Sequence, residues 1–164
     1  MLRIIAAVLA GLLTFFVVVT FLDIVGSIMY PLPEGLDVFD PAQRDALAAH
    51  MATQPVGAWL FPFSAELFGA FAGALVAAII ERRHALPLVI TIVGLALVGS
   101  ITNWVSFPHP LWYMVGQVLG YAGFGWLAWR GTRAPSDIPV DPDAPTIPIS
   151  DAITERSRNE REDD

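Results

Sequence analysis

Four long apolar stretches, separated by short polar segments, dominate the chain. They run over about residues 4–30, 57–80, 85–105 and 111–129. Each is close to or above the roughly 20 apolar residues that an α-helix needs to cross the hydrocarbon layer of a bilayer. Backbone polar groups find no water there, so spans of this kind form helices. The pattern predicts an all-α fold, with a four-helix transmembrane bundle over residues 1–131.

The charged residues that flank these stretches predict the orientation of the chain. Four crossings place both termini on one side of the membrane. The opposite side carries only Arg44, whereas the shared side carries Arg3, Arg82, Arg83, Arg130 and Arg133. Positive charge accumulates on the cytoplasmic side, so we expect both termini in the cytoplasm. The first stretch exceeds the apolar core of a signal peptide and no Ala-x-Ala site follows, which favours a retained anchor.

The loop between the first two spans carries the signals of a short helix. Asp40 is suited to cap a helix and Pro41 to occupy its first position, which predicts a helix over about residues 41–52 on the periplasmic side. The connections at residues 81–84 and 106–110 are tight, so the spans that they join should be antiparallel neighbours. This order predicts a compact bundle.

The C-terminal segment differs in composition from the rest of the chain. Residues 134–164 hold nine acids and three arginines, whereas residues 1–133 hold seven acids and six arginines. Prolines recur at 135, 139, 142, 145 and 148. Such a composition buries too little apolar surface to fold. We predict an acidic, proline-rich disordered cytoplasmic tail over residues 132–164, either simply solvated or binding a cytoplasmic protein.

Composition narrows the classes of function. The chain is 55% hydrophobic and 15% charged, which is typical of a membrane protein and too apolar for a soluble domain. It has no cysteine, which excludes disulfides and thiolate metal sites. No phosphate-binding glycine loop, Ser-His-Asp order or nucleic-acid patch is present. We therefore expect the lipid bilayer as a partner, no nucleic acid and no cofactor.

One acidic residue, Glu66, lies deep within the second apolar stretch. A charge facing lipid at this position would cost several kcal/mol. Counted at about 1.5 Å per residue, Glu66 lies about 13 Å below the outer start of its helix. Other polar residues fall in the same outer half of the spans or just above it. Together they predict an intramembrane polar layer: Asp23, Glu66, Ser100, Asn103, His109 and Gln117.

Three interpretations of this layer remain open. In the first, a neutral Glu66 binds Gln117, Ser100 or a backbone carbonyl and holds helices together. In the second, Asp23 and Glu66 exchange protons as a transported ion passes. In the third, Asp23, Glu66 and His109 form a metal-dependent site, although no ligand spacing accompanies them.

Small residues recur at helical spacing on two of the predicted spans. Ala65, Gly69, Gly73 and Ala77 repeat every four residues, and Gly116 and Gly120 do so on the last span. Rows of this kind let helix backbones approach closely. The contact is either within the chain or in a homo-oligomer.

Several short motifs carry a family resemblance. They are Tyr30-Pro31-Leu32-Pro33-Glu34-Gly35-Leu36-Asp37, then Asp40-Pro41, Gly69-Ala70-Phe71-Ala72-Gly73 and Phe107-Pro108-His109-Pro110-Leu111-Trp112. In this order they resemble a group of small bacterial four-span inner-membrane proteins, over about residues 1–130. The resemblance implies a bacterial inner-membrane bundle with a periplasmic Tyr-Pro-x-Pro loop and a Pro-His-Pro-Leu-Trp turn, and implies no activity.

The function expected from these observations is that of a non-enzymatic integral membrane protein. It is either free-standing or an accessory subunit of a larger membrane complex, with that complex or further copies of the chain as partners. The alternative is a small proton- or ion-coupled transporter that uses Asp23 and Glu66.

Overall fold

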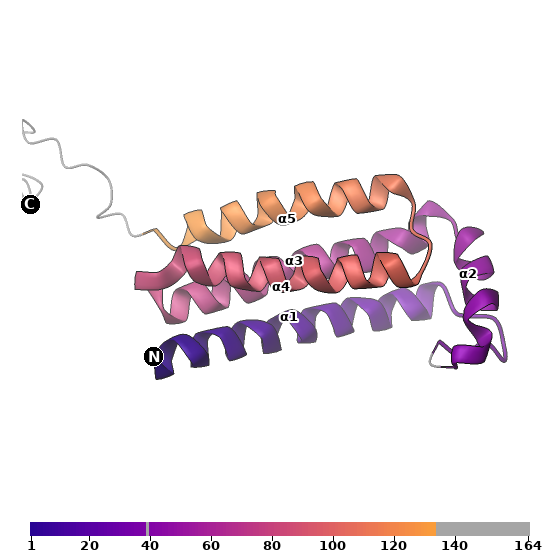
Figure 1. Ribbon diagram of the computed structural model, residues 1–164, viewed down its shortest axis with the longest axis horizontal. Helices are drawn as coiled ribbons and strands as arrows, with labels where there is room; N and C mark the ends of the chain where they lie inside the picture. Colours follow the sequence, from indigo (N-terminus) through magenta and orange to yellow (C-terminus); the bar gives the residue numbers. More distant parts are fainter. Residues whose placement is uncertain (39, 134–164) are drawn as a thin grey trace, which may run out of the picture. The chain divides into compact units, whose positions relative to one another are not determined.

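The computed structural model describes residues 1–38 and 40–133, and this part of the chain consists of helices joined by short connections (Figure 1). The all-α prediction is confirmed. Residues 134–164 of the predicted tail lie outside the described residues, so that prediction stays untested. The helices are α1 (Leu2–Met29), η1 (Pro41–Gln43), α2 (Arg44–Ala52), α3 (Val56–Ile80), η2 (Arg82–His84), α4 (Ala85–Ser106) and α5 (Leu111–Gly131).

Three helical segments among the described residues are long and apolar enough to cross a membrane. They are Leu2–Met29, Val56–Ile80 and Arg82–Ser106. The predicted fourth span, α5, has 21 residues, a sufficient length at about 1.5 Å each, but it is less apolar than the others. Tyrosines, glycines and Gln117 account for the difference. Its crossing of the membrane therefore stays a prediction.

Helix α3 is the centre of the arrangement, since it contacts α1, α4 and α5. The four long helices lie side by side lengthwise, with α2 near one end (Figure 1). At the other end the N-terminus of α1 meets the C-terminus of α3, where Arg3 Nε donates to the Ile80 carbonyl over 2.9 Å. The last turn of α5 lies there too, with Gly131 close to Leu75. Five of the six described arginines thus flank one end.

The small residues of α3 form a tight contact with α1. A Cβ atom built on Gly73 would lie 2.5 Å from the Gly11 carbonyl oxygen, and one built on Gly11 would lie 2.7 Å from the Gly73 oxygen. Real Cβ contacts are not this short, so both positions require glycine. One turn away, a Cβ on Gly69 would lie 2.8 Å from Val19. This row is therefore a contact within one chain.

At the contact between α3 and α5, only one of the two helices contributes small residues. Here α3 supplies the large side chains, Phe63 and Leu67, and α5 supplies Gly116 and Gly120. A Cβ on Gly120 would lie 2.6 Å from Leu67, and one on Gly116 would lie 3.0 Å from Phe63. The second small-residue row thus also serves packing within the chain.

The predicted helix in the first loop begins as a one-turn 3₁₀ helix and continues as α2. Asp40 Oδ1 accepts from the Ala42 backbone N–H over 2.9 Å, and Pro41 occupies the first position, as the capping signals predicted. Arg44 anchors this helix, because its Nη2 donates to the Ser106 carbonyl over 2.8 Å at the end of α4.

Candidate functional site

Glu66 lies on α3, and its carboxyl group is turned toward α4 and α5. The Oε2 atom accepts hydrogen bonds from Ser100 Oγ of α4 and from two residues of α5. Gln117 Nε2 donates over 2.6 Å and Tyr121 OH over 2.8 Å. One oxygen atom thus joins three helices. We call Glu66, Ser100, Gln117 and Tyr121 the Glu66 network.

The hydroxyl groups of Ser100 and Tyr121 also approach each other. Ser100 Oγ and Tyr121 OH are 2.7 Å apart, so with Glu66 Oε2 they form a ring of three oxygen pairs at hydrogen-bonding distance. Each hydroxyl oxygen thus lies within hydrogen-bonding distance of two other oxygen atoms of the network, and Ser100 Oγ also donates to the Ala96 carbonyl over 3.1 Å. The three side chains therefore form one connected cluster of hydrogen-bonding groups.

A second shell of contacts fixes the amide of Gln117. Trp104 Nε1 of α4 donates to Gln117 Oε1 over 3.0 Å, which orients Nε2 toward Glu66. Gln117, Tyr113, Tyr121 and Ser100 are all buried, with at most 3% of each exposed. In the described part of the chain no buried side-chain nitrogen or oxygen lacks a hydrogen-bond partner. The polar atoms of the Glu66 network are therefore satisfied internally.

Glu66 also borders a cavity of about 200 Å³ between α1, α3 and α4. Apart from Glu66 and Ser100 its lining is apolar, with Phe15 and Val19 from α1 and Ile92 and Ala96 from α4 among the contributors. None of the residues that line this cavity is basic. The arrangement is suited to holding helices together, since one carboxyl oxygen of α3 accepts from side chains of α4 and α5.

The structure brings together three of the six residues of the predicted polar layer: Glu66, Ser100 and Gln117. Asp23 lines a different cavity, between α1 and α3. Asn103 is exposed on α4. His109 packs against the rings of Trp59 and Tyr113, with its Nδ1 2.8 Å from the Phe107 carbonyl oxygen.

The sequence interpretation missed Tyr121, Tyr113 and Trp104. Both tyrosines are four residues from Gln117, so they lie on its face of α5. That spacing was the available signal. Trp104 lies on α4, and its indole N–H donates to Gln117 Oε1, a contact that no spacing within one helix reveals.

The metal-dependent alternative finds no matching geometry. Within residues 1–38 and 40–133, no group of three histidine, cysteine or acidic side chains is placed to hold a metal ion. Asp23 and Glu66 line different cavities, and the ring of His109 packs against Trp59 and Tyr113.

The fold and the site define a helical protein whose three most apolar helices are compatible with a membrane protein. No protein-family model, curated protein or solved structure matches the chain.

Proposed function

We propose that this chain is a non-catalytic integral membrane protein of a bacterial inner membrane, acting as an accessory subunit of a larger membrane complex. The observation that supports it is the Glu66 network. The one acidic side chain in the middle of α3 accepts hydrogen bonds from α4 and α5, so it holds the helices together. A site of chemistry would instead need a reactive group left available.

The surface of α1 supports the accessory role. Only Ala7 and Gly11 of its 28 residues are buried, because the helix contacts the rest of the chain along one narrow face. Large side chains cover the remaining circumference, and Leu13 and Phe16 are 67% and 60% exposed. This surface offers room for a partner helix as well as for lipid.

Photo-crosslinking tests the accessory role. A photoreactive residue replaces Phe16 on α1 or, as a control, the equally exposed Val98 on α4, 61% exposed. We expect Phe16 to yield a cross-link to one protein that also co-purifies stoichiometrically in mild detergent. Val98 should give little protein adduct. Isolation of the chain alone, with no adduct from either position, would contradict the proposal.

The proposed topology has four spans, α1, α3, α4 and α5, with both termini in the cytoplasm and α2 in the periplasm. The support is the grouping of Arg3, Arg82, Arg83, Arg130 and Arg133 at one end of the described unit. Helix α5 lies alongside the other spans, and its length suffices for a crossing.

The chain has no cysteine, so single cysteines report topology directly. We expect Ala49→Cys on α2 to react with a membrane-impermeant maleimide in intact spheroplasts. His84→Cys, at the opposite end, should react only after permeabilisation. Both residues are exposed in the fold, so differences in labelling reflect the membrane. The reverse pattern would overturn the orientation.

The alternative, a proton- or ion-coupled transporter, needs Asp23 and Glu66 to exchange protons. The two carboxyl groups line separate cavities, and Glu66 directs its hydrogen bonds toward α4 and α5 rather than toward Asp23. This geometry gives the alternative less support than the structural role.

A further inference from the structure

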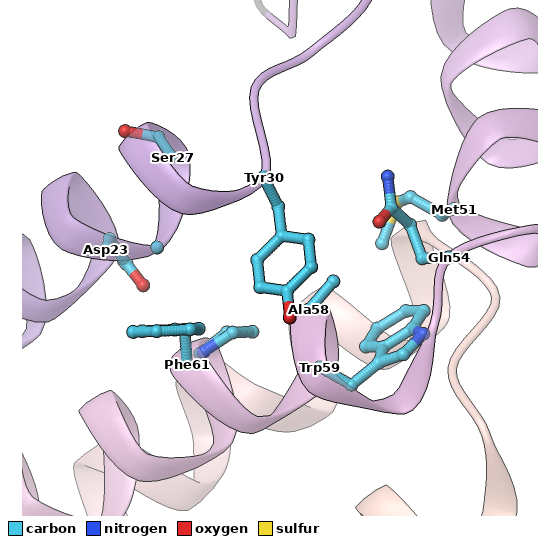
Figure 2. A pocket seen from close by; sticks show the side chains of 10 residues that line it. Asp23, Ser27, Tyr30, Met51, Gln54, Ala58, Trp59 and Phe61 are labelled. Carbon is cyan, nitrogen blue, oxygen red and sulfur yellow. The ribbon is translucent and has the colours of Figure 1, made fainter.

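A second cavity, of about 200 Å³, lies between the C-terminal end of α1, the end of α2 and the start of α3 (Figure 2). The Glu66 network does not use it. Its polar and aromatic lining includes Asp23, Tyr30, Gln54, Trp59 and Phe61. The cavity lies at the end of the described unit that is opposite Arg3. The proposed topology places this end at the periplasmic surface of the inner membrane.

The acidic side chain of this cavity belongs to Asp23, six residues before the end of α1 at Met29. It makes no hydrogen bond or ion pair with any described residue, and the two ion pairs found in that part of the chain both involve Glu81. In Figure 2 its carboxyl group projects from α1 toward Phe61 of α3. An acidic side chain in an apolar helix is costly unless it meets a partner.

Aromatic rings form much of the wall. The ring of Tyr30 reaches from the end of α1 to the start of α3, and its centroid is 6.0 Å from that of Phe61. A Cβ on Gly57 would overlap the Tyr30 hydroxyl, so glycine is required for this placement. Trp59 is only 8% exposed and holds its ring at the same cavity. Tyr30 and Trp59 thus pack closely at this wall.

A backbone acceptor is also available. Pro62 lies inside α3 and has no N–H, so the carbonyl of Ala58, four residues earlier, loses its usual helical partner. Both residues line the cavity. An unpaired carbonyl in a membrane helix needs a donor from outside the helix.

A carboxyl group without a hydrogen-bond partner in the described chain, a carbonyl without its usual helical donor and aromatic faces are groups that recognise an ammonium ion, through charge-assisted hydrogen bonds and cation–π contacts. From this combination we propose that the cavity binds a primary ammonium group. The group belongs either to a phosphatidylethanolamine headgroup at the membrane surface or to a small free amine. The inference is independent of the accessory role proposed above.

Native mass spectrometry of the full chain in mild detergent tests the site. The protein is titrated with phosphatidylethanolamine and with phosphatidylglycerol of the same acyl chains. We expect preferential retention of phosphatidylethanolamine, and we expect Asp23→Asn to reduce that retention about tenfold while leaving phosphatidylglycerol unchanged. The matched control is Glu34→Gln, which removes an exposed carboxylate that does not line the cavity.

A second arm separates the two sources of ammonium. Ethanolamine is titrated and binding followed by isothermal calorimetry. Saturable binding that is lost in Asp23→Asn, without a lipid preference, supports the site with a free amine as its ligand. Asp23 holds no hydrogen bond in the fold, so Asp23→Asn should keep its helical circular dichroism. The proposal is overturned if neither probe binds in an Asp23-dependent way.

Discussion

Gly73→Ala is expected to destabilise the protein by about 1–3 kcal/mol, because the added methyl group would lie 2.5 Å from the Gly11 carbonyl oxygen. The obstructing atom belongs to a backbone, so no side-chain rotation relieves the overlap. The two helices must separate, and the neighbouring contacts of Gly69 separate with them. Gly73→Leu should be worse still. Unfolding in mixed detergent, followed by circular dichroism, measures the change.

Gly94→Ala is the matched control for this prediction. Gly94 is an exposed residue of α4, and a Cβ atom built on it meets no atom within 4 Å. Its replacement should be neutral, or stabilising by up to about 1 kcal/mol through helix propensity. Equal effects at Gly73 and Gly94 would refute the close contact of α1 with α3. Gly11→Ala should not add fully to Gly73→Ala, because both act on one contact.

Glu66→Ala should lower the free energy of unfolding by about 2–4 kcal/mol, since it removes the acceptor shared by Ser100, Gln117 and Tyr121. The hydroxyls of Ser100 and Tyr121 can still form a hydrogen bond with each other, but the buried Gln117 Nε2 loses its acceptor on Glu66. Glu66→Gln keeps a carbonyl oxygen in place and should cost less than about 1 kcal/mol. The same unfolding assay, with the level of protein in the membrane, measures both variants.

A double-mutant cycle identifies the interaction. Gln117→Leu removes the amide that depends on Glu66, so Glu66→Ala and Gln117→Leu together should cost clearly less than the sum of their separate effects. Asn103→Leu is the control partner, because Asn103 is exposed on α4 and lies outside the network. If the destabilising effects of Glu66→Ala and Gln117→Leu simply add, the proposed interaction within the Glu66 network is contradicted. A severe loss of folded protein for Glu66→Gln would show that the charge itself is structural.

The long helices were predictable because their signal is local. An apolar run of sufficient length defines a helix by itself, and Pro41 and Asp40 marked the start of the loop helix in the same way. The fourth span is the exception, because the tyrosines of α5 that build the polar network also make it less apolar. The polar residues that build the network thus lower the hydropathy by which α5 would be identified as a membrane span.

The site was predicted only in part, because position along a helix reveals depth but not direction. Asp23 and Glu66 were both assigned to the outer half of the spans, yet one lines the cavity beside Tyr30 and the other bonds to α4 and α5. The rotation of each helix depends on its neighbours. The row of Gly69 and Gly73 likewise identified a close contact without naming the helix that makes it.

The two faces of α3 impose different rules on sequence change. Toward α1 both sides of the contact are already minimal at Gly11 and Gly73, so no substitution can be compensated. Toward α5 one helix supplies a large side chain and the other a glycine, since Leu67 fills the space beside Gly120. We expect this seam to tolerate an exchange of volume, with a smaller residue at position 67 and a larger one at position 120. Coupled variation should therefore mark the contact of α3 with α5, and invariance the contact with α1.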